Sequence, residues 1–447
     1  FFPSVSGGWR VSEEAFWKVN PDLFSNLKIR ASYGSLGNGN VSPYSFLELL
    51  SISTSGRVLN GLKNKYTSAP AVMPDGLTWE TATTTDVGLD FGMLNNRLQF
   101  NGDYYIRKTT DMYTVGETLP DVFGASSPKG NYADMTTKGW EITLTWRDQF
   151  TLAEKPFNYE IRGTLSDYIS TIDRYNNQTG NLDDYYAGKR VGEIWGYVTE
   201  GLFKDQADID SHADQTLIQS SSKRITYPGD VKIKDLNGDH VIDYGNNTVD
   251  DHGDKTVIGN ALPRYAYSIN LSGDWNNFFL SAFFQGVGKQ DWYPSSECIF
   301  WGQYNRPYNN MPTWHQGNYW TEDNTDAYLP RYAGYNASLK STPQTRYLQN
   351  VAYIRLKNLQ FGYTLPQPIV SKAKLQNVRV YISAENLWCW SPLYKHTRDL
   401  DVTNIYGSDP DLTDADMSSG LNGNRGSGDG NSYPQMKSVS LGLSVTF

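Results

Sequence analysis

The last twelve residues of the chain, MKSVSLGLSVTF at Met436–Phe447, alternate between apolar and small polar side chains. The apolar positions are Val439, Leu441, Leu443, Val445 and Phe447. Because successive side chains of a strand point to opposite faces, the segment predicts a β-strand with one apolar and one polar face. The alternation runs to the terminal aromatic residue, which is typical of a closing barrel strand whose outward flank meets lipid.

The same alternation recurs along the chain and predicts about eleven antiparallel strands. The expected segments are 5–11, 27–33, 87–93, 98–106, 140–146, 157–165, 265–271, 278–284, 353–365, 378–384 and 436–447. In one of them the phase of Ile354 and Leu356 differs from that of Leu359 and Phe361, so a β-bulge near Lys357–Asn358 is expected. The fold class predicted is therefore all-β.

The connections between these segments alternate between short and long. Tight turns are expected at 94–96 and 274–277 and modest ones at 148–156 and 366–377, whereas long loops span about 37–77, 109–136, 168–262, 288–350 and 391–434. Short turns at one end and long loops at the other are the pattern of a transmembrane antiparallel β-barrel in an outer membrane. In that orientation the C-terminus is periplasmic and the long loops are extracellular.

Composition excludes several other classes. The chain of 447 residues contains 31 Tyr, 13 Trp and 18 Phe, too many aromatic residues for a disordered chain. Its mean hydropathy is -0.55, and it has no run of 18 apolar residues from which a membrane-spanning helix could form. A net charge of -9 argues against a nucleic-acid partner, and two cysteines provide no disulfide framework.

An odd number of strands cannot close a single-chain bacterial barrel, and an open sheet edge cannot face lipid. We therefore expect the chain to be part of a barrel of about 22 strands, with the remaining strands and a lumen-filling domain supplied by a missing segment. Charged residues of both signs fall on the polar faces: Arg30, Asp90, Asp103, Arg107, Glu141, Glu160, Arg162, Arg264, Arg355, Arg379 and Glu385. They suit a docked plug and an uncharged polar cargo; alternatively, they balance one another around solvent.

Several segments resemble a known family. WETATTTDVGLDFGMLNNRLQFNGDYYIRKTTDMY at Trp79–Tyr113 is similar to paired barrel strands of TonB-dependent outer-membrane transporters. GDVKIKDLNGDHVIDYG, KTVIGNALPRYAYSINLSGDW, NYWTEDNTDAYLPRY, YIRLKNLQFGYTLP and VRVYISAENLW resemble the SusC-like, glycan-importing branch. The resemblance identifies residues 1–447 as the C-terminal part of such a barrel, with the plug domain and first strands outside the chain.

The resemblance implies an importer in the outer membrane of a Gram-negative bacterium. Its expected partners are the lipid bilayer, a SusD-like surface lipoprotein, and the TonB complex, which would act through the missing N-terminal part. The expected function is TonB-dependent import of oligosaccharides. Import of peptides by a similar barrel, or a non-energized adhesin or pore, are the alternatives.

One loop has the spacing of a calcium site. Asp235, Asn237, Asp239 and Asp243, with the carbonyl of Val241, match positions 1, 3, 5, 9 and 7 of an EF-hand loop. His240 replaces the turn glycine and Asn246 replaces the bidentate glutamate. We expect a structural Ca²⁺ or, alternatively, a turn in which these side chains accept hydrogen bonds from their own backbone.

Aromatic residues gather in one long loop, where Trp292, Tyr293, Trp301, Tyr304, Trp314 and Trp320 are candidates for contact with cargo or with the lipoprotein lid. Flat rings beside amide side chains suit the apolar face and hydroxyl rim of a sugar. Packing between loops is the alternative for each of them. The five histidines lack HExxH spacing, and no GxSxG or Walker motif occurs, so neither an enzyme nor a required cofactor is expected.

Overall fold

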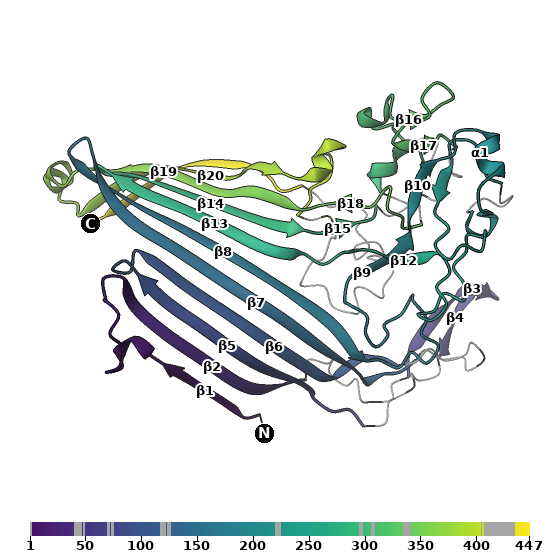
Figure 1. The fold of residues 1–447 in the computed structure, drawn as a ribbon, viewed down its shortest axis with the longest axis horizontal. Helices are drawn as coiled ribbons and strands as arrows, with labels where there is room; N and C mark the ends of the chain where they lie inside the picture. Colours follow the sequence, from purple (N-terminus) through teal and green to yellow (C-terminus); the bar gives the residue numbers. More distant parts are fainter. Residues whose placement is uncertain are drawn as a thin grey trace.

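The structure is a computed structural model, which describes residues 2–39, 47, 50–68, 72, 76–116, 122, 127–219, 225–294, 298–304, 309–333, 340, 342–403, 405 and 434–447. Its main feature is an eleven-stranded antiparallel sheet in the order β1-β2-β5-β6-β7-β8-β13-β14-β19-β20-β21 (Figure 1). The number of strands and the fold class predicted from the alternation are thus confirmed.

Each strand of this sheet overlaps one predicted segment; most extend beyond it, whereas β1 ends at Trp9, before the predicted Val11, and β19 and β21 are slightly shorter than predicted. The strands are β1 (Ser4–Trp9), β2 (Phe24–Asn38), β5 (Glu80–Met93), β6 (Leu98–Val115), β7 (Lys129–Leu152), β8 (Lys155–Arg174), β13 (Arg264–Trp275), β14 (Phe278–Lys289), β19 (Tyr353–Thr364), β20 (Asn377–Trp390) and β21 (Ser438–Thr446). Each strand pairs with its sequence neighbour within the sheet.

The irregular strand contains the predicted bulge. Phe283 pairs with Asn358 and Phe284 with Leu356, so Lys357 is the extra residue. The register toward β20 also shifts between Leu356 and Asn358. The bulge returns the apolar residues on both sides of it to one face, as the sequence pattern required.

The tight turns lie at one end of the sheet. Asn276 and Asn277 have φ of 47° and 70°, and Ala153 and Glu154 have φ of 47° and 62°, the left-handed pair of a two-residue hairpin. Strand β7 runs to Leu152, so the connection expected at 148–156 is a tight turn instead of a modest loop. In Figure 1 the turns gather near the C-terminus, and the long loops gather at the opposite end.

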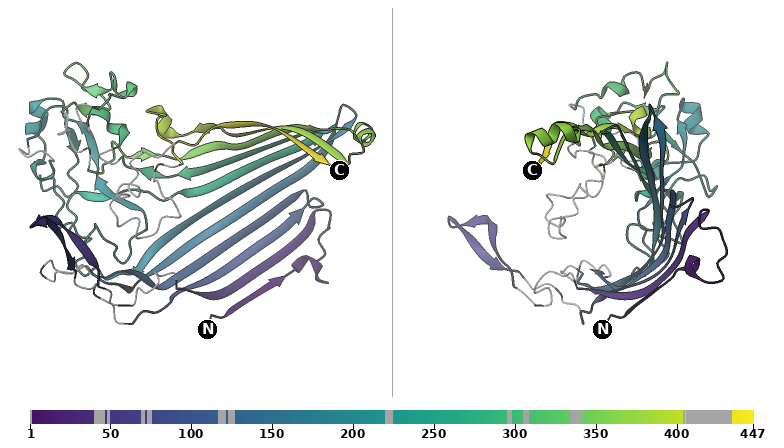
Figure 2. Two further views of the ribbon diagram at one scale, coloured as in Figure 1. Left: turned by 180° about the vertical axis from the view of Figure 1, so that it is seen from behind. Right: turned by 90° about the vertical axis from the view of Figure 1, so that its left-hand side faces the viewer.

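The two faces of the sheet differ in chemistry. One face presents exposed apolar side chains on every strand from β1 to β21; Val5, Ile29, Leu89, Leu144, Ile161, Leu271, Leu280, Phe361, Ile382 and Leu441 are examples. The other face carries polar and charged residues. Figure 2 shows the sheet as a curved wall whose edge strands, β1 and β21, lie apart. A wall with an exposed apolar face is what a lipid-facing sheet requires.

The long loops contain short elements that the sequence pattern did not predict. Small sheets pair β3 (Ile52–Leu59) with β4 (Leu62–Thr67), β9 (Glu193–Tyr197) with β12 (Lys255–Asn260), β10 (Thr199–Leu202) with β11 (Val231–Ile233), β15 (Asp291–Trp292) with β18 (Gln349–Asn350), and β16 (Tyr319–Trp320) with β17 (Leu329–Arg331). The helices are α1 (Gln206–Asp210) and α2 (Gln367–Val370) and the 3₁₀ turns Val11–Glu13, Thr216–Ile218, Ile299–Tyr304, Thr313–His315, Ser371–Ala373 and Pro392–Lys395. Within the described part of the chain, no helix is long and apolar enough to cross a membrane.

Candidate functional site

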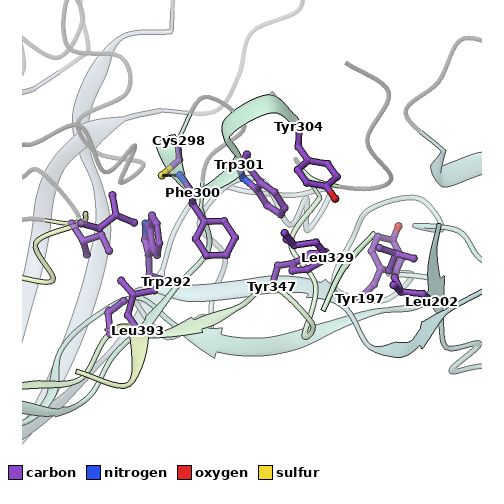
Figure 3. Packing of buried hydrophobic residues seen from close by; sticks show 14 of the residues in the cluster. Tyr197, Leu202, Trp292, Cys298, Phe300, Trp301, Tyr304, Leu329, Tyr347 and Leu393 are labelled. Atoms are coloured by element: carbon purple, nitrogen blue, oxygen red, sulfur yellow. Dashed lines mark hydrogen bonds between the residues drawn. The ribbon is translucent and has the colours of Figure 1, made fainter. Parts of the chain in front are cut away.

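The loops at the far end of the sheet share a hydrophobic core, which we call the loop cluster (Figure 3). It is built from three long connections, because its members include Tyr197 and Ile233 from the first, Trp301 and Tyr347 from the second, and Leu393 from the third. Burial of these apolar side chains holds the three connections together as one body. Surfaces of the loop cluster are therefore fixed relative to one another.

The candidate aromatic residues are divided by their exposure. Trp292, Trp301 and Tyr304 are 0–1 % exposed, so their rings have no surface free for a cargo in this structure. The Tyr304 hydroxyl donates to the carbonyl of Pro330 at 2.6 Å, and the Trp301 Nε1–H donates to that of Pro294 at 3.2 Å. For Trp292, Trp301 and Tyr304, the structure therefore shows packing between loops, which was the alternative interpretation.

Tyr293, Trp314 and Trp320 are only partly buried at the border of the same cluster. Trp314 lies against Phe300 and His396, with ring centroids 5.0 and 5.6 Å away. The structure therefore brings all six aromatic residues into one region, and Tyr293, Trp314 and Trp320 are the three of them that are not fully buried. Their contact with a cargo or lid stays a prediction.

Asp230 and Arg331 connect two of the long connections. The Arg331 Nε–H donates to Asp230 at 2.7 Å, its backbone N–H donates to the Gly229 carbonyl at 2.8 Å, and its guanidinium lies 4.5 Å from the Tyr227 ring centroid. Asp230 is 2 % exposed. Burial raises the pKa of the Asp230 carboxyl, and the charge of Arg331 opposes that rise. This ion pair joins two of the long connections, and we call Asp230 and Arg331 together the latch.

His315 lies inside the loop cluster as a neutral ring. It is 0 % exposed, and one ring nitrogen, Nε2, lies 2.9 Å from the Phe300 carbonyl, which assigns the proton to Nε2. Nδ1 has no hydrogen-bond partner within the described part of the chain. Burial lowers the pKa of His315 to about 4. His315 is thus a packing residue, and among the residues that the structure describes it has no acidic partner of the kind a catalytic base would use.

In the candidate calcium loop, the carboxylates accept hydrogen bonds from the backbone. Asp235 accepts from the N–H groups of Gly238 and His240 at 2.6 and 2.9 Å, and Asp239 accepts from that of Val241 at 2.8 Å. These hydrogen bonds lower the pKa of Asp235. The described residues contain no group of three His, Cys, Asp or Glu side chains placed to hold a metal ion. This arrangement matches the alternative interpretation, in which the loop is a turn whose side chains accept hydrogen bonds from their own backbone.

Two other observations keep calcium as a proposal. His240 has φ of 66°, so it adopts the left-handed conformation for which an EF-hand loop uses glycine. Asp254, which is 0 % exposed, accepts from the N–H groups of Leu236 and Asp243 at 2.7 and 3.0 Å and braces both ends of the loop. The backbone is therefore fixed in a turn from which carboxylates could rotate toward a cation.

We predict that Ca²⁺ at about 100 times its dissociation constant stabilises this loop by about 2.7 kcal/mol, whereas chelation removes the effect. Hydrogen exchange of residues 234–246 in the complete receptor measures it. The matched variant is Asp239→Asn, which keeps the acceptor for Val241 but removes one negative charge. It should reduce the calcium effect and leave exchange in the chelator unchanged. If the backbone amides of residues 234–246 in the unmodified protein exchange equally fast with and without Ca²⁺, the loop is a turn that is held by its own hydrogen bonds and binds no calcium.

On the polar face of the sheet, several of the charged residues pair with one another. Arg30 lies 2.8 Å from both Asp90 and Asp103, and Arg147 lies 2.5 Å from Glu160. Toward the turn end, β7, β8, β13, β14 and β20 line a hollow of about 680 Å³ whose wall includes Arg97, Arg147, Glu160, Asp274 and Arg379. These ion pairs support the alternative interpretation, in which the inward charges neutralise one another. Docking of a plug against this face stays a prediction.

Together, an apolar outward face, a polar inner face and a fixed loop cluster define a wall of a transport-type outer-membrane barrel. No family model matches the chain. Over its whole length the chain is 28 % identical to TonB-dependent receptor P26 and 29 % identical to TonB-dependent receptor P3, both of Formosa agariphila. It is 23 % identical to TonB-dependent receptor SusC of Bacteroides thetaiotaomicron. The chain spans 40–42 % of the length of these relatives.

Solved structures agree with this fold. The RagAB peptide importer in its closed-closed state superposes with a TM-score of 0.70 at 19 % identity, covering 100 % of this chain and 43 % of that one. The RagAB peptide transporter gives a TM-score of 0.66 at 20 % identity, covering 87 % of this chain and 39 % of that one. The chain is homologous to TonB-dependent receptors of the SusC type, as its motifs indicated. TonB-dependent receptors are outer-membrane proteins of Gram-negative bacteria, and the relatives are receptors and transporters, not enzymes.

Sequence reasoning missed the latch and the buried histidine. Asp230 stands directly before Val231 and Ile233, both 0 % exposed, and a charged residue beside such a strand was the available signal. Its partner Arg331 lies 101 residues away, and no local pattern connects the two. His315 lacked any signal, because its burial depends on the packing of Phe300 and Tyr304 from another turn.

Proposed function

We propose that the chain forms the C-terminal wall of a TonB-dependent importer that carries oligosaccharides across the outer membrane. The observation that carries the proposal is the continuous sheet, apolar on one face and polar on the other, combined with similarity to TonB-dependent receptors along the full chain. The turn end and the C-terminus lie in the periplasm, and the loop cluster lies outside the cell. The remaining strands and the plug come from the part of the receptor beyond this chain.

An oligosaccharide is proposed because the inward charges are of mixed sign and several of them are already paired. Arg30 with Asp90 and Asp103, and Arg147 with Glu160, leave the wall locally balanced, so it offers hydroxyl, amide and paired ionic groups to a cargo. Such a surface suits an uncharged polar molecule better than an ion. Tyr293, Trp314 and Trp320 at the border of the loop cluster would supply ring faces to sugars.

Peptide import is the second candidate, because the RagAB structures that share this fold are described as a peptide importer and transporter. At 19–20 % identity that likeness concerns the fold. The two candidates share the same barrel and the same energy source. They differ only in the surface that the loops and plug present to the cargo.

A surface lipoprotein of the SusD type is the proposed partner at the loop end. The hairpin β3–β4 supports this proposal, because it is exposed almost throughout and its Leu59, Leu62 and Tyr66 side chains are 63 %, 67 % and 53 % exposed. An isolated two-stranded hairpin is marginally stable in water. A partner surface that covers these side chains would stabilise it.

The proposal predicts energy-dependent uptake. In cells that lack the receptor, restoring the complete protein should restore accumulation of a fluorescent oligosaccharide, and a protonophore that collapses the inner-membrane proton gradient should abolish it. A passive pore would pass the same oligosaccharide with and without the protonophore. That second result would replace the importer with the pore alternative.

A further inference from the structure

The outward surface of β6 and β7 changes in chemistry toward the loop end. Starting from the turn end, the outward cross-strand pairs are Leu98–Trp146, Phe100–Leu144, Gly102–Ile142, Tyr104–Trp140, Ile106–Lys138 and Lys108–Thr136. The surface is thus apolar from Leu98 to Ile142, with Trp146 at its turn end, then aromatic at Tyr104–Trp140, and then carries the two lysines. Tyrosine and tryptophan concentrate where a membrane meets water, and basic residues follow at the level of the headgroups.

The two lysines at the end of this series are exposed and unpaired. Lys108 and Lys138 are both exposed, and neither has an ion-pair or hydrogen-bond partner among the residues that the structure describes. They lie on adjacent strands and are offset by one pair, which places their β-carbons as diagonal neighbours about 7–8 Å apart. Their flexible side chains can therefore meet at a single anion.

Acidic side chains near these lysines already have other partners. Asp134 lies 2.7 Å from Arg174, and Asp167 lies 2.5 Å from Arg264. Asp173 accepts a hydrogen bond from the Thr136 hydroxyl at 2.5 Å. Among the described residues, the positive charge of Lys108 and Lys138 is therefore not neutralised, and it is available to an external anion.

We propose that Lys108 and Lys138 together bind the phosphate of a lipid headgroup in the outer leaflet of the membrane. The proposal rests on the proposed function, since that orientation places the loop end of the sheet outside the cell. The lipid chains would lie along Leu144 and Ile142, which are 46 % and 37 % exposed, and the headgroup would rest above the Tyr104–Trp140 pair. Two ammonium groups on one phosphate give a charge-assisted contact that weakens with salt.

The test uses native mass spectrometry of the complete receptor in detergent, titrated with lipid A or with the same lipid lacking phosphate. The unmodified protein should retain lipid A and release the dephosphorylated form. The double variant K108Q/K138Q should bind lipid A roughly 25-fold more weakly. The matched control K372Q removes an exposed lysine at the turn end and should bind lipid A normally.

Equal retention of both lipids, or equal loss of lipid A in K372Q and K108Q/K138Q, would overturn the proposal. Oligosaccharide uptake separates this outcome from failure of the proposed function. If uptake by the unmodified receptor remains energy-dependent while phosphate has no effect on lipid binding, only the lipid site is wrong. If uptake itself is independent of energy, the proposed function fails first.

Discussion

Replacing Trp301 with alanine is expected to destabilise the loop cluster by about 3–5 kcal/mol. Trp301 is 0 % exposed and lies against Phe300 and Tyr347, with ring centroids 5.2 Å away in both cases. Its removal loses the burial of a large ring and leaves a cavity inside the second long connection, between the segments around Phe300 and Tyr347. The sheet should keep its strands, because none of them depends on this side chain for pairing.

Hydrogen exchange of the complete receptor measures this effect. In Trp301→Ala, backbone amides of residues 298–304 and 342–351 should exchange faster, while those of β6 and β7 should not. The matched control is Trp79→Ala, because Trp79 is 60 % exposed and its loss should change stability by about 0.5 kcal/mol or less. Similar exchange in the two variants would mean that the loop cluster is not held by its buried aromatic core.

Replacing Arg331 with alanine is expected to open the latch and to destabilise it by about 3 kcal/mol at neutral pH. Asp230 would remain buried with its backbone donor at Tyr227 but without the guanidinium. Hydrogen exchange of residues 225–233 and 327–331 would report the opening. Lys232→Gln is a control on the same segment, since Lys232 pairs with Asp208 outside the latch.

The effect of Arg331→Ala should depend on pH in one direction. The pKa of Asp230 is already above that of the unfolded chain, and removing the guanidinium raises it further. The penalty of a buried, unpaired carboxylate is therefore full above the folded pKa and disappears as the pH falls below the ordinary aspartate value. A penalty that grows on acidification would show that Asp230 is not the group left unpaired.

Alternation was sufficient to predict the sheet. Because an exposed apolar face must repeat on every strand, each strand carries its own signal, and the phase error around Lys357 located the bulge. The connection at 148–156 was predicted too long, because β7 continues to Leu152 and β8 begins at Lys155. Asp148 interrupts the outward apolar alternation, which resumes at Phe150 and Leu152.

The loop cluster could not be predicted in the same way. Tyr197, Trp301 and Leu393 meet through connections far apart in sequence, and none has a local period. Aromatic content correctly marked the region, but it did not distinguish the buried Trp292 and Trp301 from the partly exposed Trp314 and Trp320. The motif at Asp235 located a tight acidic turn, whereas its occupancy by calcium depends on an ion that no sequence pattern contains.

Competition during energized uptake distinguishes import of oligosaccharides from import of peptides and from passive flow through a pore. Cells that produce the complete receptor would be given a fluorescent oligosaccharide with an excess of unlabelled oligosaccharide or of unlabelled mixed peptides. The account predicts that the oligosaccharide competitor suppresses accumulation, the peptides do not, and a protonophore abolishes it. Suppression by peptides alone would assign the importer to peptide cargo, and accumulation that persists with the protonophore would contradict energy-coupled import.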